Sequence, residues 1–316
     1  MMDPIEVANS ILRLSKRQDE GAFLLARLVT SQLREQPIDT SLPQWQNQLA
    51  GSVEEALRRD LDSLPALQRN GDSLPHAARE LLGALAWAYG NGFPDDLWPL
   101  AATALSPTGT SYTRDDVFWL LSQAGRWVVE AGEEGRAMYR LAHQRLADHL
   151  RPGGWITPWK PVEEPEAVAL AESLGKQSLE WLKAGRPPQE QPYLWRYFWQ
   201  HAVDAGEAGI GILRELADSN AAYRLDLTIA LNNLGNRYSE LGRRADALPP
   251  TEAAVTTCRE MAAANPAFRP DLANTLNNLG VCYSNLGRRE EALPPTEEAV
   301  TTYRELAAVN PAFRHD

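Results

Sequence analysis

Apolar residues recur three or four positions apart through most of this chain, which is the spacing that places them on one face of an α-helix. From residue 5 to residue 67 this spacing predicts helices, and residues 52–55 have the capping-box pattern that starts one of them. We therefore expect residues 1–75 to form a helical, lid-like segment.

The periodicity changes from 3.6 to 2 within residues 76–152. Three helical stretches come first, and Thr113 can cap the third. Alternating apolar residues then flank the Gly-Glu-Glu-Gly sequence at 132–135, which predicts a β-hairpin, and a helix from His143 to Leu150 follows. Three helices, a hairpin and a closing helix predict a winged-helix domain.

A linker and more helices come next. Residues 151–165 contain four prolines and two glycines, a composition typical of a linker. A helical stretch over 166–184 and an aromatic segment at 193–199 follow. Residues 214–217 resemble residues 259–262, which lie one period of 45 further on. We expect residues 153–218 to be a helical linker that ends in half a repeat.

The strongest pattern in the chain is a tandem repeat. Residues 226–264 and 271–309 align without a gap and are identical at 27 of 39 positions, with a period of 277 − 232 = 45 residues. Each copy contains two helical stretches, so residues 219–316 are expected to form an α-solenoid. The chain as a whole is expected to be mainly α, with one small hairpin.

Each copy resembles the tetratricopeptide repeat. We call the first helical stretch of each copy helix A and the second helix B. The period of 45 exceeds the family's usual length of about 34, which predicts that both helices are extended. Thr251 and Thr296 stand where a large aromatic residue is usual. The resemblance implies a groove that binds a protein or peptide partner. It is carried in the first copy by Leu234, Gly235, Tyr238, Gly242, Ala247 and Ala254, and in the second by Leu279, Gly280, Tyr283, Gly287, Ala292 and Ala299.

Two proline pairs, at 249–250 and 294–295, fall where helix B of each copy should already have begun. Proline is tolerated in the first turn of a helix but clashes further in. We therefore expect helix B to start late, near Ala247 and Ala292, or to bend there.

Upstream of the repeats the chain resembles the region that follows the nucleotide-binding core of STAND-type signalling ATPases, the NACHT and NB-ARC relatives of actinobacteria. Residues 21–27 are similar to their helical lid, and residues 90–94 and 139–143 to their winged helix. The resemblance implies that His143 senses bound nucleotide and that the repeats sense a partner. From the residues alone, His143 is better explained as the N-terminal residue of a surface helix, and the resemblance brings the two hypotheses near balance.

Charge argues against nucleic acid as a partner. The formal charge of the chain is −11, which disfavours phosphate and anionic membranes. The third helix of the predicted winged helix carries Asp115 and Asp116, and its hairpin tip carries Glu133 and Glu134. A DNA-binding regulator is therefore kept only as an alternative.

The chain lacks the patterns of export and of membrane insertion. The N-terminus has no basic, signal-like start, and no apolar run approaches about 18 residues. Cys258 and Cys282 lie inside the repeats without a metal-like spacing. We expect a cytoplasmic protein with reduced thiols and no membrane partner.

No pattern in the sequence predicts catalysis. The only Gly-Lys pair, at 175–176, lacks the glycine spacing and the hydroxyl residue of a phosphate-binding loop. His143 and His149 fall on different faces of a helix, so they do not predict a metal site. We expect a non-enzymatic protein with no cofactor and no metal.

Asparagines are the candidate binding residues. In the geometry that the family resemblance implies, Asn232, Asn236, Asn274 and Asn277 lie on the face of helix A that lines the groove. An amide both donates and accepts hydrogen bonds, so a row of amides can hold a peptide backbone of any sequence. The alternative is that these are surface residues without a ligand. The aromatic residues at 195–199 are expected to pack rather than to bind a ligand.

Residues 310–314 repeat residues 265–269 and would open a third copy. We therefore expect the array to continue in the native protein, or two copies to associate through the uncapped last repeat. Our main hypothesis is a regulatory, protein-binding module of a STAND-type signalling protein. A free-standing tetratricopeptide adaptor is the first alternative.

Overall fold

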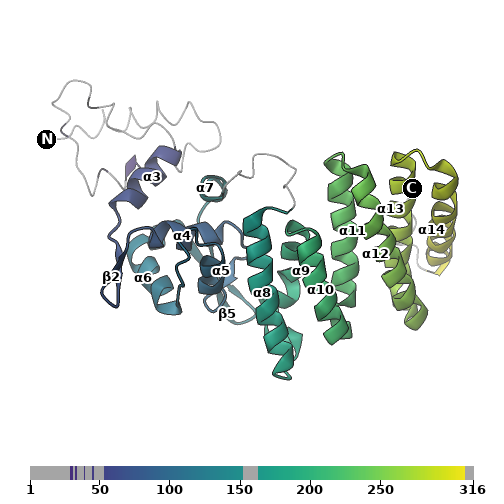
Figure 1. Ribbon diagram of the computed structural model, residues 1–316, viewed down its shortest axis with the longest axis horizontal. Coiled ribbons are helices and arrows are strands. Elements are labelled where there is room, and N and C mark those ends of the chain that lie inside the picture. The colour runs from purple at the N-terminus through teal and green to yellow at the C-terminus, as the bar shows by residue number, and fades with distance from the viewer. Residues whose placement is uncertain are drawn as a thin grey trace. The chain divides into compact units, whose positions relative to one another are not determined.

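A computed structural model describes residues 53–151 and 163–309, together with a few isolated positions between 29 and 45. The helices expected before residue 53 and the start of a third repeat at 310–314 lie largely or wholly outside the described residues. The chain divides into two compact units, residues 1–157 and residues 158–316. The structure is mainly helical, as predicted (Figure 1).

The described residues of unit 1 form helices and two small antiparallel sheets. Its three-stranded sheet has the order β3-β5-β4, and its other sheet is the hairpin β1–β2. In chain order the elements are α3 (Val53–Ser63), β1 (Leu67–Arg69), β2 (Asp72–Leu74), α4 (Ala77–Leu85), β3 (Phe93–Pro94), α5 (Trp98–Ala104), α6 (Arg114–Ala124), the 3-10 helix η2 (Gly125–Trp127), β4 (Val128–Glu133), β5 (Arg136–Leu141) and α7 (Gln144–Leu150).

The predicted hairpin is β4–β5, with Val128 opposite Leu141 and Glu133 opposite Arg136. Its turn is shorter than expected, because only Glu134 and Gly135 lie between the strands, both at positive φ. Strand β3 was not predicted. It pairs with β5 through Phe93 and Tyr139.

The hairpin β1–β2 was not predicted either. Its turn is Asn70–Gly71, with φ values of 53° and 89°. Asn-Gly is the residue pair most favoured in two-residue hairpin turns, because both residues tolerate the left-handed backbone that the turn requires. The sequence therefore carried the signal, but three-residue strands are too short to show a period of 2.

Buried polar contacts hold the elements of unit 1 together. Asp60 of α3 accepts hydrogen bonds from Arg126, at 2.6 Å to Nη2 and 3.1 Å to Nε, and from the indole N–H of Trp127. The indole N–H of Trp98 donates to the carbonyl of Leu81 at 2.8 Å. Because both carboxylate oxygens of Asp60 are paired, α3 is held to η2, the segment between α6 and β4.

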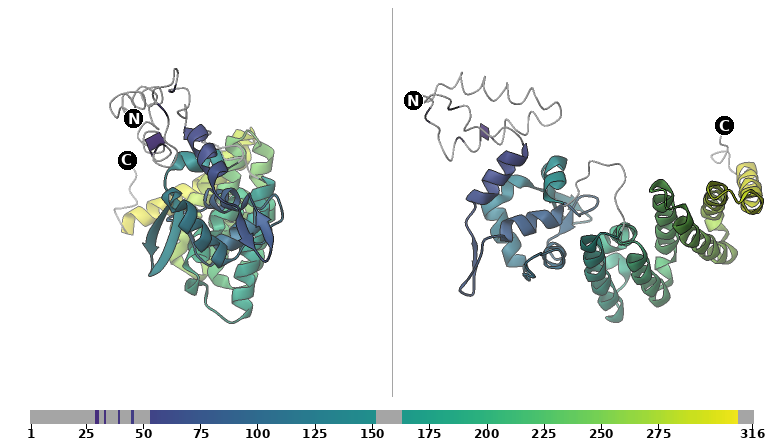
Figure 2. Two further views of the ribbon diagram at one scale, coloured as in Figure 1. Left: turned by 90° about the vertical axis from the view of Figure 1, so that its left-hand side faces the viewer. Right: turned by 45° about the horizontal axis from the view of Figure 1, so that its top comes forward.

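The described residues of unit 2 form seven α-helices, which follow one another side by side in sequence order (Figure 2). Helices lie at both expected places, over 166–184 and ending near residue 218. The elements are α8 (Pro165–Lys183), η3 (Pro188–Glu190), α9 (Pro192–Asp204), α10 (Glu207–Ser219), η4 (Ala221–Tyr223), α11 (Arg224–Glu240), α12 (Arg244–Ala264), η5 (Pro266–Phe268), α13 (Arg269–Asn285) and α14 (Arg289–Val309).

Helices α11 and α12 form repeat 1, and α13 and α14 form repeat 2. The same turn leads into each repeat. The side-chain oxygens of Asn220 and Asn265, one period apart, accept hydrogen bonds at 3.0 Å from the backbone N–H of Ala222 and Ala267. The predicted solenoid of 45-residue repeats is therefore confirmed in its local turn geometry as well as in its helix order.

The expectation that helix B starts near Ala247 and Ala292 is wrong. Helix α12 begins at Arg244 and α14 at Arg289, so both proline pairs lie inside the helices. The first turn closes ahead of the prolines, because the N–H of Ala247 donates to the carbonyl of Arg243 at 3.1 Å. Proline has no backbone N–H, so the carbonyls of residues 245 and 246 receive no helical hydrogen bond from the proline pair. Both residues are exposed, so water can donate to these carbonyls instead.

Helices A and B of each repeat approach closely at a glycine. A Cβ atom on Gly235 would lie 2.2 Å from the hydroxyl oxygen of Thr251, and one on Gly280 would lie 2.3 Å from that of Thr296. Each hydroxyl donates back to its own helix, Thr251 to the carbonyl of Ala247 at 2.8 Å. The threonines that replace an aromatic residue of the family pattern therefore fill the space beside the glycines.

Candidate functional site

A small pocket lies between helices α11 and α13, with one residue of α12 at its edge. Its volume is about 140 Å³, and both polar and apolar groups line it. Six of the eight lining residues carry an amide, a hydroxyl or a carboxylate. The lining residues are Asn236, Ser239, Glu240, Thr251, Asn278, Val281, Cys282 and Asn285.

A hydrogen bond between the two repeats forms beside this pocket. The side-chain N–H of Asn278 on α13 donates to the side-chain oxygen of Asn232 on α11 at 2.9 Å. Asn232 is only 9% exposed, so its oxygen would otherwise be poorly solvated. The bond fixes the distance between the two A helices and holds the amide of Asn278 at the pocket wall.

The four asparagines expected in the groove have different environments. Asn236 is exposed and lines the pocket. Asn232 is buried and bonds to Asn278, so it supports the site instead of facing it. Asn274 and Asn277 are exposed on α13 and are not among the residues that line this pocket.

Two further amides, Asn278 and Asn285, line the pocket and were missed from the sequence. Asn278 is one residue beyond the expected Asn277, and one residue rotates the side chain by about 100° around a helix. Asn285 is the periodic counterpart of Glu240, since 285 − 240 = 45. The same position of helix A thus faces the pocket from both repeats, which the alignment of the copies could have indicated.

The pocket offers hydrogen bonds and one negative charge. Among the described residues, Glu240 is the only charged residue in its lining, and none of them places a cationic side chain there. Burial raises the pKa of the Cys282 thiol, and the carboxylate of Glu252 raises it further. A thiol held in its neutral form is a poor nucleophile, so the site is suited to binding rather than to covalent chemistry.

His143 lies in unit 1, between the last residue of β5 and the first of α7. Its side chain is partly buried, and its backbone carbonyl accepts from the N–H of Leu146 at 3.0 Å. It therefore lies one residue before α7, which the sequence predicted to begin at His143 itself. A nucleotide-sensing role for His143 stays a prediction.

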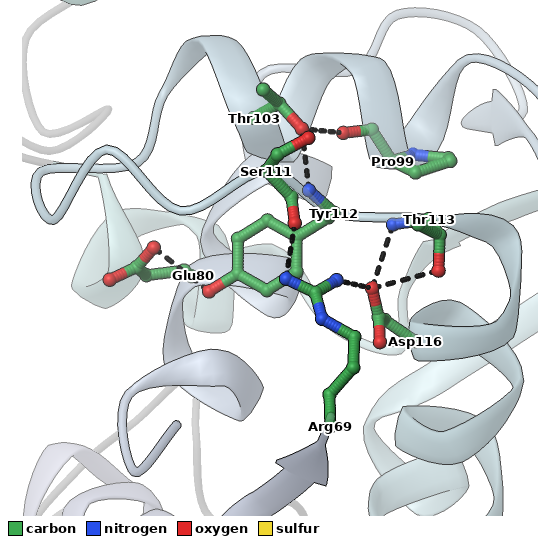
Figure 3. A network of polar contacts seen from close by, with 8 residues as sticks. All are labelled: Arg69, Glu80, Pro99, Thr103, Ser111, Tyr112, Thr113 and Asp116. Atoms are coloured by element: carbon green, nitrogen blue, oxygen red, sulfur yellow. Dashed lines mark hydrogen bonds and ion pairs between the residues drawn. The ribbon is translucent and has the colours of Figure 1, made fainter. Parts of the chain in front are cut away.

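The surface of α6 differs from the one expected for the third helix of the predicted winged helix. Asp115 is exposed, but Asp116 is 3% exposed and points into unit 1 (Figure 3). Its carboxylate accepts from Arg69 at 2.6 Å and from the backbone N–H of Thr113 at 2.7 Å. Asp116 therefore caps α6 and anchors β1, and only Asp115 is available to repel phosphate on this helix.

The same network includes a second carboxylate contact, to the partly buried Glu80. Tyr112 donates to Glu80 at 2.9 Å (Figure 3). Burial, and then the hydrogen bond to Glu80, raise the pKa of Tyr112 above its usual range. The phenol stays protonated, so this group acts as a structural donor.

The aromatic segment at 193–199 forms helix α9 and packs inside unit 2. Tyr193 and Phe198 are buried, and the hydroxyl of Tyr193 lies 2.9 Å from Nε2 of His201. The ring of Trp195 contacts that of Tyr223, which leads into repeat 1, at 5.3 Å between centroids. The expectation that the aromatic residues at 195–199 pack agrees with these contacts.

Within the part of the chain that the structure describes, no group of three or more histidine, cysteine, aspartate or glutamate side chains is placed to hold a metal ion. Across the same residues, no helix combines the length and the apolar character needed to cross a bilayer.

Comparison with known proteins identifies the repeats. Residues 228–264 and 272–309 match the tetratricopeptide repeat family. These ranges correspond to repeats 1 and 2, with their period of 45 residues and their paired helices. A search of curated proteins and a search of solved structures found no match to the chain. Repeats of this family typically bind other proteins, and the resemblance of the upstream region to signalling ATPases stays a prediction.

Proposed function

We propose that this protein is a non-enzymatic interaction module whose two tetratricopeptide repeats bind an extended peptide segment of a partner protein in the pocket between α11 and α13. The observation that carries the proposal is the set of amides at the pocket: Asn236 from repeat 1, and Asn278 and Asn285 from repeat 2. Peptide backbones present alternating N–H and C=O groups, and amide side chains can bind both.

The pocket's charge defines the partner further. A peptide that ends in a free carboxylate there would meet Glu240 and no compensating cation. A neutral or basic segment would pair with Glu240 instead. We therefore propose an internal peptide segment with a lysine or arginine beside the bound backbone.

A peptide library displayed on phage and selected against the full chain tests this function. Selected peptides are expected to bind in the micromolar range and to lose about tenfold in affinity with Asn236→Ala or Asn285→Ala, since each change removes hydrogen bonds of about 1.4 kcal/mol in total. Glu240→Gln should weaken the basic peptides most.

Asn274→Ala is the matched control, because Asn274 is an exposed amide on the same helix as Asn285 but does not line the pocket. It should leave binding unchanged. Peptides that bind equally well to the Asn236 and Asn285 variants would show that the pocket is not the binding site.

A regulatory role for unit 1 is the wider part of the proposal. The order α4, β3, α5, α6, β4, β5, with β3 paired to β5, is consistent with a winged helix and supports the resemblance to STAND-type signalling proteins. In this proposal, unit 1 relays partner binding by the repeats to a nucleotide-binding core. The buried thiols of Cys258 and Cys282 support a location in the reducing cytoplasm.

Calorimetric titration with ADP and ATP separates this role from that of a simple adaptor. This chain lacks a phosphate-binding loop, so no binding is expected until a core domain is added. With a core present, His143→Ala should weaken ADP binding. Unchanged ADP affinity would reject the sensing role of His143 but leave peptide binding by the repeats untouched.

DNA binding is the less favoured alternative for unit 1. The exposed residues of α6 include Arg114, Asp115 and Phe118, and Arg114 is engaged by Asp95. One neutralised arginine beside a carboxylate gives little attraction to phosphate. Tight binding of a DNA duplex at low salt would overturn this preference.

A further inference from the structure

Glu163, which lies just ahead of α8, is bonded to α9, α11 and the start of α12. Its carboxylate accepts a hydrogen bond from the hydroxyl of Tyr238 at 2.7 Å and lies 3.2 Å from Nη1 of Arg243. Its backbone N–H donates at 3.0 Å to the carbonyl of Asp204, the last residue of α9. We call Glu163 and these three partners the Glu163 latch.

The backbone of Glu163 is in the left-handed region, with a φ of 68°. This conformation is unfavourable for a residue with a side chain, because the Cβ atom crowds a backbone carbonyl. The other non-glycine residues with positive φ in the described parts of the chain, Asn70 and Glu134, lie in two-residue hairpin turns that require it. Glu163 lies outside these hairpins, so the contacts of the latch hold its backbone in a strained conformation.

The turn after α9 leaves room for the side chain of Glu163. A Cβ atom on Gly206 would lie 2.4 Å from Cγ of Glu163. The hydrogen bond from Tyr238 lowers the pKa of Glu163, and Arg243 lowers it further, against the opposing effect of burial. The latch therefore holds an ionised carboxylate, which makes both of its side-chain contacts charge-assisted.

The last two turns of α11 carry the latch on one side and the pocket on the other. The residues of α11 that line the pocket are Asn236, Ser239 and Glu240. Between them in sequence, Arg237 donates to the carboxylate of Asp204 at 2.6 Å, and the next residue is the latch tyrosine, Tyr238. Successive side chains of a helix point about 100° apart, so these two residues lie on the face opposite the pocket. A movement of this part of α11 therefore changes both sets of contacts.

Repeat 2 has the same tyrosine and arginine without the strain. Tyr283 donates to Glu252 at 2.7 Å, and the guanidinium of Arg288 lies 4.8 Å from the centre of the Tyr283 ring. Glu252 is inside α12, so an ordinary helical backbone presents its carboxylate. The strained contact belongs to repeat 1, and strain in the closed state makes a contact easier to open.

We propose that the Glu163 latch is a releasable contact that sets the affinity of the pocket by positioning the end of α11. This role rests on the proposed function, because the pocket is the proposed peptide site. In the closed state, α11 is held from behind while Asn236 and Glu240 face the peptide. In the open state, Glu163 returns to an extended backbone and the end of α11 loses the contact of Tyr238. The peptide therefore binds the closed state more tightly and, by reciprocity, keeps the latch closed.

Hydrogen exchange at the backbone amide of Glu163 reports on the latch directly, because this amide donates to Asp204. Tyr238→Phe removes only a hydroxyl group and should speed this exchange about tenfold. Glu163→Ala should do the same from an exposed position, without a change in the core of repeat 1. Amides in α8 and α10 should keep their exchange rates in both variants, which distinguishes opening of the latch from unfolding of unit 2.

Tyr283→Phe is the matched control for exchange. It removes the equivalent hydroxyl from repeat 2, where the acceptor is Glu252. It should leave exchange at the amide of Glu163 unchanged.

Peptide titration tests the link between the latch and the pocket. A peptide selected on phage against the full chain should slow exchange at Glu163 by about fivefold at saturation. Tyr238→Phe and Glu163→Ala should weaken binding of that peptide by up to the same factor, because the coupling is reciprocal. Glu260→Gln is the control for affinity, since it removes only an ion pair with Arg224 at the other end of α11.

Exchange at Glu163 that neither variant speeds overturns the proposal. A peptide that binds the parent chain without slowing this exchange, or that binds both variants as tightly as the parent, overturns the coupling and leaves the proposed function standing. A parent chain that binds no selected peptide rejects the proposed function and, with it, this control of the pocket.

Discussion

Repeats 1 and 2 have nearly the same sequence but different surroundings. Val255 and Val300 are the same residue one period apart, yet their exposed fractions are 2% and 41%. Asn232 is buried by repeat 2, and its counterpart Asn277 is exposed. The difference shows that the neighbouring repeat, not the residue itself, decides whether a position of this pattern belongs to a core or to a binding surface.

The two repeats also differ in what covers the side that faces the preceding part of the chain, here called the entry side. Tyr283 of repeat 2 donates to Glu252 of repeat 1, as expected for stacked repeats. Tyr238, its counterpart, donates at 2.7 Å to Glu163, which precedes α8, and Arg243 lies 3.2 Å from the same carboxylate. Glu163 thus takes the role that a preceding repeat would fill, so the array is closed on its entry side by the chain before it.

Substitution of the paired glycines should give the largest difference between the repeats. Gly235→Ala is expected to destabilise unit 2 by about 2–3 kcal/mol, because the new methyl group would collide with the buried hydroxyl of Thr251. Gly280→Ala should have an effect of at most about 1 kcal/mol, since Thr296 is exposed and can rotate away.

Urea unfolding of the two variants measures this difference. Thr251→Ala in the Gly235→Ala background should recover part of the loss, because it removes the colliding oxygen. Equal losses at the two glycines would mean that the second repeat is as tightly covered as the first.

The paired valines should give the next largest difference. Val255→Ala removes two methyl groups from a core shared with repeat 2 and is expected to lower the free energy of unfolding by about 2 kcal/mol. Val300→Ala changes an exposed side chain and should stay within about 0.5 kcal/mol of the parent. If thermal unfolding shows similar losses for both, then Val300 is covered in solution.

Much of the fold could be predicted from the sequence because its signals are local. The period of 45, the helices of unit 2 and the hairpin at 128–141 all follow from spacing and turn residues. The β1–β2 hairpin and the early start of α12 could not be read in this way. The first has strands of only three residues, and the second depends on backbone hydrogen bonds that close ahead of Pro249.

The candidate site was predicted less completely, because it depends on contacts between repeats. Asparagine clustering on helix A pointed to the right helices, and Asn236 does line the pocket. Successive side chains of a helix point in directions about 100° apart, and this rotation decides that Asn278, not the neighbouring Asn277, faces the pocket. Likewise, the aspartate pair at 115–116 could not be divided into an exposed and a buried member without the position of Arg69.

The smallest expected difference concerns acid residues at the start of helix A. Burial raises the pKa of Asp226 in repeat 1 to about 7, from an ordinary value of 3.8. The pKa of its counterpart Asp271 is also raised by burial, but a hydrogen bond from its own backbone opposes the shift.

A raised pKa means that the folded chain binds more protons than the unfolded chain between pH 3.8 and about 7, so Asp226 lowers stability as the pH rises through that window. Asp226→Asn should therefore stabilise unit 2 by about 1 kcal/mol more at pH 8 than at pH 4.5, after allowance for its partial exposure. Asp271→Asn should show the same sign and a smaller change. Urea unfolding at the two pH values measures both, and an equal gain at pH 4.5 and pH 8 would show that Asp226 is ionised normally in repeat 1.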